Sequence, residues 1–253
     1  MSFFEVADTS YDNFMGRYSS QLAPLFADFA GIREGLAVVD VGAGTGALTS
    51  ELVRRGAEVA AADPSGTFVT ALQARLPDIA VHAAPAEHLP WPDERFHAAL
   101  AQLVVTFMDD APAGVQEMRR VVQPGGTVAV AMWDREGMEM LAAVHRTQRA
   151  LASDTPAVEA RTLYRTREEI ESLFEDGFTD TQTELLAVES AYSGFEELWS
   201  TILGGAGPAG AWLVSLDEQG RAAAHERLYE EVGALEGPFT LAAKAWATRA
   251  TRA

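Results

Sequence analysis

The chain has 253 residues, of which 48% are hydrophobic and 22% charged, the proportions of an ordinary globular protein with a large core. Its 37 acidic and 19 basic residues give a formal net charge of −18 at pH 7, which repels nucleic-acid phosphates and argues against a nucleic-acid partner. The absence of cysteine excludes disulfides and Cys-ligated zinc, and the absence of a signal pattern or a long apolar run favours a cytoplasmic protein with no membrane partner.

The first predicted element is a helix that runs to about residue 29. The large apolar side chains of this helix share one face, namely Leu22, Leu25, Phe26 and Phe29. We expect this face to pack on the edge of a sheet, so that residues 1–34 form an N-terminal cap.

The next stretch, Val38 to Leu52, passes from apolar β-formers through three alternating glycines into helix-favouring residues. This pattern predicts a strand, a tight turn and a helix start, the first half of a βαβ unit. A side chain at Gly42 or Gly44 would keep a ligand away from the backbone, whereas the N–H groups at the helix start would face it. The stretch therefore predicts a ligand-binding loop, because three glycines in a turn without a ligand would only cost backbone entropy.

A second predicted strand ends in Asp63, about 20 residues beyond the glycine loop. A parallel neighbouring strand would place this carboxylate against the ribose hydroxyls of a nucleotide, with which it forms charge-assisted hydrogen bonds. Asp63 and Ser65 also flank the start of a predicted helix, so a capping role is equally natural. The two roles are compatible, and the spacing favours the ribose.

Strands and helices continue to alternate up to residue 134. Further strands are predicted at residues 79–84, 98–107 and 127–134, and a helix begins at Asp109 and Asp110. This alternation predicts an α/β fold, with a parallel sheet and helices on both faces. Gln102 interrupts the apolar fourth strand, and we expect it beside the ligand because ligands gather outside the carboxyl ends of such strands.

The acid at Asp40, followed by glycines at every second position, resembles motif I of class I S-adenosylmethionine-dependent methyltransferases and differs from the G-x-G-x-x-G spacing of dinucleotide-binding loops. The resemblance covers residues 35–134 well. It implies a Rossmann-like sheet of seven mostly parallel strands with an antiparallel last strand, and S-adenosylmethionine as the cofactor. The cofactor-binding residues that it implies are Tyr11, Arg17, Asp40, Gly42, Ala43, Gly44, Gly46, Asp63, Pro64, Ala86, Glu87 and Gln102.

Two further segments carry the resemblance. The sequence from Tyr11 to Arg17 is similar to an N-terminal segment that closes over the cofactor in small-molecule methyltransferases, with the arginine facing the cofactor carboxylate. The sequence that begins at Ala86 and Glu87 resembles the loop that recognises adenine. The acid usual before Ala86 is replaced by Pro85, which has neither an N–H group nor a carboxylate, so the adenine contact would fall to the backbone of Ala86 and to Glu87.

Beyond residue 134 the regular alternation stops. The elements expected there are helices at 135–151, 166–174, 195–203 and 216–235, strands at 179–192 and 237–247, and a turning Gly-rich connection at 204–208.

We interpret residues 1–253 as one methyltransferase domain with a cofactor-binding core at 35–134. Helical insertions at 135–165 and 193–235 are expected to form a lid over the acceptor. Trp133 and His145 are the candidates for the acceptor pocket. The five histidines show neither metal-ligand spacing nor an apparent dyad: His82, His88, His97, His145 and His225.

The resemblance implies methyl transfer to a small molecule, since the Asn-Pro-Pro-Tyr-like motif of enzymes that methylate nucleic-acid amino groups is absent. The leaving group is a neutral thioether, so the protein would mainly align and desolvate the acceptor. Two alternatives stay open. One is a non-catalytic nucleotide-binding scaffold with this fold, for which Pro85 leaves room. The other is a nicotinamide-dependent oxidoreductase, which would need the third glycine one residue later and a Tyr-x-x-x-Lys pair.

Overall fold

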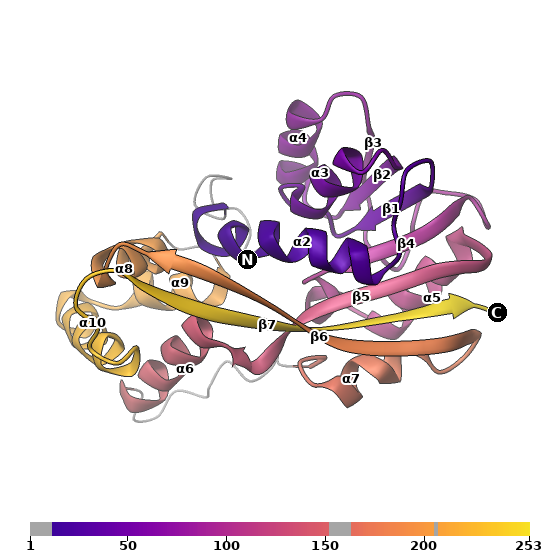
Figure 1. Cartoon of the computed structure of the whole chain (residues 1–253). Coiled ribbons are helices and arrows are strands. Elements are labelled where there is room, and N and C mark those ends of the chain that lie inside the picture. The colour runs from indigo at the N-terminus through magenta and orange to yellow at the C-terminus, as the bar shows by residue number, and fades with distance from the viewer. Residues whose placement is uncertain (1–11, 152–162, 205–206) are drawn as a thin grey trace. The chain divides into compact units, whose positions relative to one another are not determined.

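The computed structural model describes residues 12–151, 163–204 and 207–253, and within them seven strands form one sheet in the order β3-β2-β1-β4-β5-β7-β6 (Figure 1). The strands β1 to β5 pair in parallel, and β7 is antiparallel. The predicted α/β, Rossmann-like sheet is therefore confirmed. No described helix has the length and apolar character needed to cross a membrane.

The strands are β1 Ala37–Val41, β2 Glu58–Asp63, β3 Ala80–Ala83, β4 Phe96–Gln102, β5 Val122–Met138, β6 Phe178–Tyr192 and β7 Phe239–Arg252. The helices are α2 Arg17–Phe29, α3 Ala47–Arg54, α4 Gly66–Arg75, α5 Ala111–Val121, α6 Glu139–Leu151, α7 Arg167–Glu171, α8 Phe195–Leu203, α9 Gly207–Ser215 and α10 Glu218–Glu231. Shorter turns of helix lie at η1 Asp12–Gly16, η2 Val105–Phe107 and η4 Ser172–Phe174.

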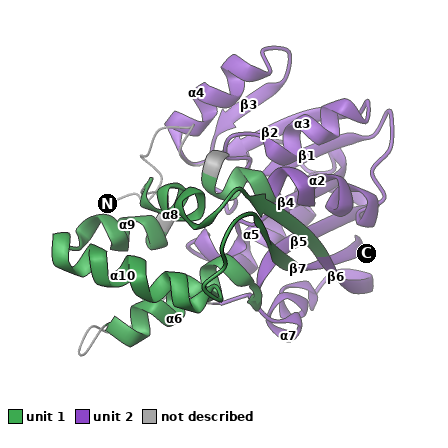
Figure 2. Cartoon of the chain, turned by 60° about the vertical axis from the view of Figure 1, so that its left-hand side comes forward, with its two compact units in different colours: residues 1–18, 135–161, 187–244 green, residues 19–134, 162–186, 245–253 purple. Residues whose placement is uncertain are grey.

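The chain divides into two compact units (Figure 2). The sheet unit consists of residues 19–134, 162–186 and 245–253, and the helical unit of residues 1–18, 135–161 and 187–244. The strands β5, β6 and β7 contribute residues to both units. The predicted division into a core and two lid insertions stays a prediction.

The core of the sheet unit lies on both faces of the sheet because successive strand residues point to opposite sides. Val39 and Val41 of β1 belong to the apolar cluster that includes α5. Val38 belongs to the cluster on the other face, which includes Phe26 of α2 and Leu52 of α3. Helices on both faces are thus confirmed.

One predicted core residue is wrong. Leu25 is 38% exposed, whereas Leu22 and Phe26 are fully buried. The buried face of α2 also includes Ala23 and Ala27. With 3.6 residues per turn, a face centred on Leu22, Ala23, Phe26 and Ala27 leaves Leu25 at its margin.

Two predicted strand boundaries are also wrong. The fourth strand ends at Gln102 rather than at residue 107, because Leu103 takes a left-handed backbone with φ +64° and the short helix η2 follows. The fifth strand begins at Val122, since Phe96 pairs with Val122 before a shift in register. Helix α9 is absent from the sequence prediction, which places a Gly-rich connection at 204–208; the helix begins at Gly207.

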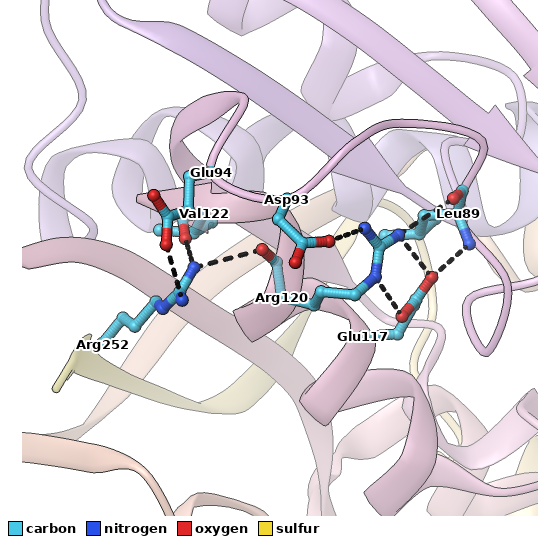
Figure 3. Close-up of polar contacts among 7 residues, drawn as sticks. All are labelled: Leu89, Asp93, Glu94, Glu117, Arg120, Val122 and Arg252. Carbon is cyan, nitrogen blue, oxygen red and sulfur yellow. Dashed lines mark hydrogen bonds and ion pairs between the residues drawn. The ribbon is translucent and has the colours of Figure 1, made fainter. Parts of the chain in front are cut away.

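A network of arginine contacts joins the end of α5 to the loop before β4 and to the end of β7 (Figure 3). The guanidinium of Arg252 donates to the carbonyl oxygens of Arg120, at 3.1 Å, and of Val122, and pairs with Glu94 at 3.1 Å. Arg120 in turn pairs with Asp93 at 2.7 Å. Because the carbonyls at a helix end have no partner within the helix, Arg252 acts as a side-chain cap for α5.

We expect Arg252→Ala to lower the free energy of unfolding by about 2 kcal/mol, because it leaves two carbonyls without their charged donor. Urea denaturation measures the change. Lys244→Ala, which removes an exposed cation from the same strand, serves as the control and should change stability by less than about 0.5 kcal/mol. Equal effects of the two substitutions would contradict the capping role.

Candidate functional site

The glycine loop connects β1 to α3 in a left-handed backbone conformation. Gly42, Gly44 and Gly46 have φ values of +72°, +54° and +92°, which residues with a side chain rarely adopt. The backbone N–H groups of Gly42 and Ala43 donate to the carbonyl of Ala62 at 2.8 and 3.1 Å. The loop is therefore held at the carboxyl end of β2, at the edge of the sheet where ligands of such folds bind.

The three glycines differ in what surrounds them. A Cβ on Gly42 would stand 2.4 Å from a methyl of Val104, and one on Gly46 would stand 2.4 Å from a methyl of Leu72. A Cβ on Gly44 would have nothing within 4 Å. Gly42 and Gly46 thus serve the packing of the loop, whereas Gly44 borders open space.

Asp63 ties the loop to the end of β2. Its Oδ2 accepts the N–H of Gly44 at 2.8 Å, and its Oδ1 accepts the N–H of Ser65 at 2.8 Å. Burial raises the pKa of Asp63, and the hydrogen bonds from Ser65 and Gly44 oppose that rise. Helix α4 is capped by the Ser65 hydroxyl, which accepts from the N–H of Phe68. The predicted ribose contact of Asp63 stays a prediction.

Asp40 is a buried carboxyl group below the loop. It is 1% exposed, and its Oδ2 accepts the hydroxyl of Thr49 at 2.6 Å. Burial raises the pKa of Asp40 to about 7; the hydrogen bond from Thr49 opposes this rise, and the neighbouring charge of Asp63 adds to it. The carboxyl group consequently changes charge near neutral pH.

Two residues that support the loop have no signal in the sequence. Thr49 holds Asp40 from the first turn of α3, and Arg75, at the end of α4, donates to the carbonyl of Thr45 at 2.7 Å. A single threonine or arginine on an amphipathic helix looks like any surface residue until the fold brings it to the loop.

Ala86 and Glu87 of the predicted adenine loop both contact the region of α5. Ala86 is buried in the cluster that includes α5, and Pro64 is exposed. The Oε1 of Glu87 accepts the backbone N–H of Asp110 at 3.0 Å, so this carboxylate reaches the start of α5. Adenine recognition by Ala86 and Glu87 stays a prediction.

Gln102 stands at the carboxyl end of β4. Its Nε2 donates to the carbonyl of Ser19 at 3.1 Å, which fixes the orientation of the amide. Its Oε1 is buried and has no hydrogen-bond partner in the part of the chain that the structure describes. Since an unpaired buried acceptor is costly, this oxygen is suited to a donor group of a ligand.

The remaining predicted site residues divide between the units. In the helical unit, Arg17 donates to the carbonyl of Ala191 at 2.6 Å and pairs with Glu197 at 3.0 Å, and His145 lies half-buried on α6. In the sheet unit, Trp133 is 3% exposed on β5. Tyr11 lies outside the described residues.

One statement about the histidines is wrong. The ring Nε2 of His225 lies 2.9 Å from Oε1 of Glu196, so the helical unit holds a histidine–carboxylate pair. The two residues are 29 positions apart on different helices, α8 and α10. No sequence spacing marks such a pair, because only the packing of the helices brings it together.

Comparison with known proteins shows a similarity to methyltransferases. Residues 39–130, which include the glycine loop, Asp63 and Gln102, match the family model of the methyltransferase domain. The match covers less than half of the chain, and the sheet has the Rossmann-like fold of class I methyltransferases.

Two relatives and a solved structure illustrate this similarity. An uncharacterized protein of Mycobacterium tuberculosis is 32% identical over 170 residues, which are 64% of this chain and 60% of that protein. The demethylmenaquinone methyltransferase of Beutenbergia cavernae is 38% identical over 104 residues, 41% of this chain and 43% of that enzyme. The matches thus span 60% or less of the length of these curated relatives.

The solved structure is that of phosphoethanolamine N-methyltransferase 2 from Haemonchus contortus, in complex with phosphomonomethylethanolamine and S-adenosylhomocysteine. It covers 100% of this chain and 60% of its own chain with a TM-score of 0.58. The sequence identity is 13%, so this likeness shows the fold alone.

We expect Gly44→Ala to lower the free energy of unfolding by about 1–2 kcal/mol, since only the left-handed backbone is strained. Gly46→Ala should cost more, because its Cβ would also overlap Leu72. Chemical denaturation of the two variants measures the difference. Equal losses would show that the space at Gly44 is filled.

A second prediction concerns pH. The pKa of Asp40 is raised in the folded chain, so its contribution to stability is present below about pH 4 and is lost as the pH rises to about 7. Asn at this position keeps an acceptor for Thr49 but does not titrate. The stability of Asp40→Asn relative to the unsubstituted chain should therefore increase from pH 5 to pH 8, as measured by urea denaturation. Parallel pH profiles would refute the raised pKa.

Proposed function

We propose that the chain transfers a methyl group from S-adenosylmethionine to a small-molecule acceptor. The observation that carries the proposal is the open space at Gly44, beside the carboxylate of Asp63, in a domain that matches the methyltransferase family. Because residue 44 is a glycine, no side chain of its own occupies this space.

The residues present fit the cofactor. Asp63 would accept the ribose hydroxyls through lone pairs that its two backbone donors leave available. The unpaired Oε1 of Gln102 would accept the ammonium group of the methionine part. Asp40 would position that same part.

Bound S-adenosylmethionine supplies the activated methyl group. The protein's own share of the work is to hold the cofactor on the loop and to keep water from the acceptor, since the sulfur leaves as a neutral thioether. A general base is needed only where the acceptor is a weakly acidic hydroxyl.

A dissolved small molecule is the proposed acceptor. The formal net charge of −18 opposes nucleic acid, and the chain would act in the cytoplasm. Trp133, in the sheet unit, is a proposed residue of the acceptor pocket. The Beutenbergia enzyme is named for a quinone and the Haemonchus complex contains a phosphorylated amine, so the named relatives differ in acceptor class.

Calorimetry with S-adenosylmethionine, S-adenosylhomocysteine and NAD tests the proposal. We expect the two sulfur nucleosides to bind and NAD not to bind. Asp63→Ala should weaken their binding about tenfold or more, because a charge-assisted hydrogen bond contributes about 1.5–3 kcal/mol. Asp78→Ala, which removes an exposed acid that follows α4, is the matched control and should bind normally.

Two outcomes would overturn the proposal. Binding of NAD without the sulfonium would favour an oxidoreductase, and no nucleotide binding at all would favour a scaffold. Where the cofactor binds, a screen of methyl transfer to phenols, amines and carboxylates identifies the acceptor class.

A further inference from the structure

The helical unit has a surface hollow of its own, which is widely open to solvent and is called the cavity below. It has a volume of about 640 Å³, within the usual range for small-molecule sites, and lies between α8 and α10. Its lining residues are Trp199, Leu203, Glu218, Arg221, Ala222 and His225. None of them belongs to the sheet unit or to the glycine loop.

Of the two arginines of this unit that make no ion pair with any described residue, Arg149 and Arg221, the one that lines the cavity is Arg221. Three others pair with carboxylates, namely Arg17, Arg146 and Arg227. Arg221 makes no ion pair with any described residue, although Glu218 lies one turn away on the same helix. Its Nε donates to the carbonyl of Leu216 at 3.0 Å, which orients the guanidinium and leaves both Nη atoms for another partner. In a chain of net charge −18, such a guanidinium beside a cavity indicates an anionic ligand.

The opposite wall of the cavity is apolar and aromatic. Trp199 and Leu203 project from α8, and the rings of Trp199 and His225 meet edge to face at 4.9 Å. His225 is held in turn by Glu196, whose carboxylate can only accept, so Nε2 of the ring carries the proton. This wall offers a fixed indole surface for a flat ring.

We propose that the cavity binds a small planar aromatic carboxylate. The carboxylate of the ligand lies on the Nη atoms of Arg221, and its ring packs against Trp199 and Leu203. Glu218 also lines the cavity, and its negative charge restricts the acid group of the ligand to the side of Arg221. The site does not depend on the proposed methyl transfer, since it uses a different ligand and different residues.

The test compares 2-naphthoate with 2-naphthamide, which has the same ring without the charge. Ligand-observed NMR on the whole protein gives the affinities. We expect naphthoate to bind at least tenfold more tightly than naphthamide, and Arg221→Gln to abolish this difference. Arg149→Gln, which removes another exposed arginine without an ion pair among the described residues, is the matched control and should preserve it.

A second variant tests the aromatic wall. Trp199→Leu should weaken the binding of both compounds but keep the preference for the acid, because Arg221 remains. Circular dichroism checks that each variant is folded. Equal binding of naphthoate and naphthamide to the unsubstituted protein, or an unchanged preference in Arg221→Gln, would overturn the proposal.

Discussion

The hydrogen bond from the N–H of Gly44 to the carboxylate of Asp63 is the contact on which the site depends. It joins the loop after β1 to the end of β2 at 2.8 Å, and the second oxygen of Asp63 fixes the path into α4 through Ser65. One side chain thereby sets the position of the loop and the direction of the next helix. The loop is held by Asp63 and by the carbonyl of Ala62, both at the end of β2. These contacts leave the space beside Gly44 open.

This arrangement places two acidic groups in a poorly solvated environment. Asp40 and Asp63 are both almost fully buried, and the charge of Asp63 raises the pKa of Asp40 further. Neither carboxyl group has an arginine or lysine partner among the described contacts; each is held by hydroxyl or backbone donors. A cationic sulfonium cofactor would relieve part of this electrostatic cost, which agrees with the proposed ligand.

The helical unit follows a different plan. Its helices are joined by aromatic contacts, such as those of Phe195 with His225 and Tyr229, and by arginine–carboxylate pairs. Arg221 and Arg149 make no such pair among the described residues, and Arg221 is the one that lines the cavity. The glycine loop and the cavity thus belong to separate units of the chain, one built on a sheet and the other on helices.

The sequence by itself determined the alternation of strands and helices, the order of the loop glycines and the acid at the end of β2, because each is a local pattern of residue types. It did not determine that α2 buries its alanines and exposes Leu25, or that β4 stops at Gln102, since both depend on what packs against the element. Only the tertiary structure separated Gly44 from Gly42 and Gly46, and only it paired His225 with Glu196. Contacts between distant residues decide these features, and spacing along the chain carries no record of them.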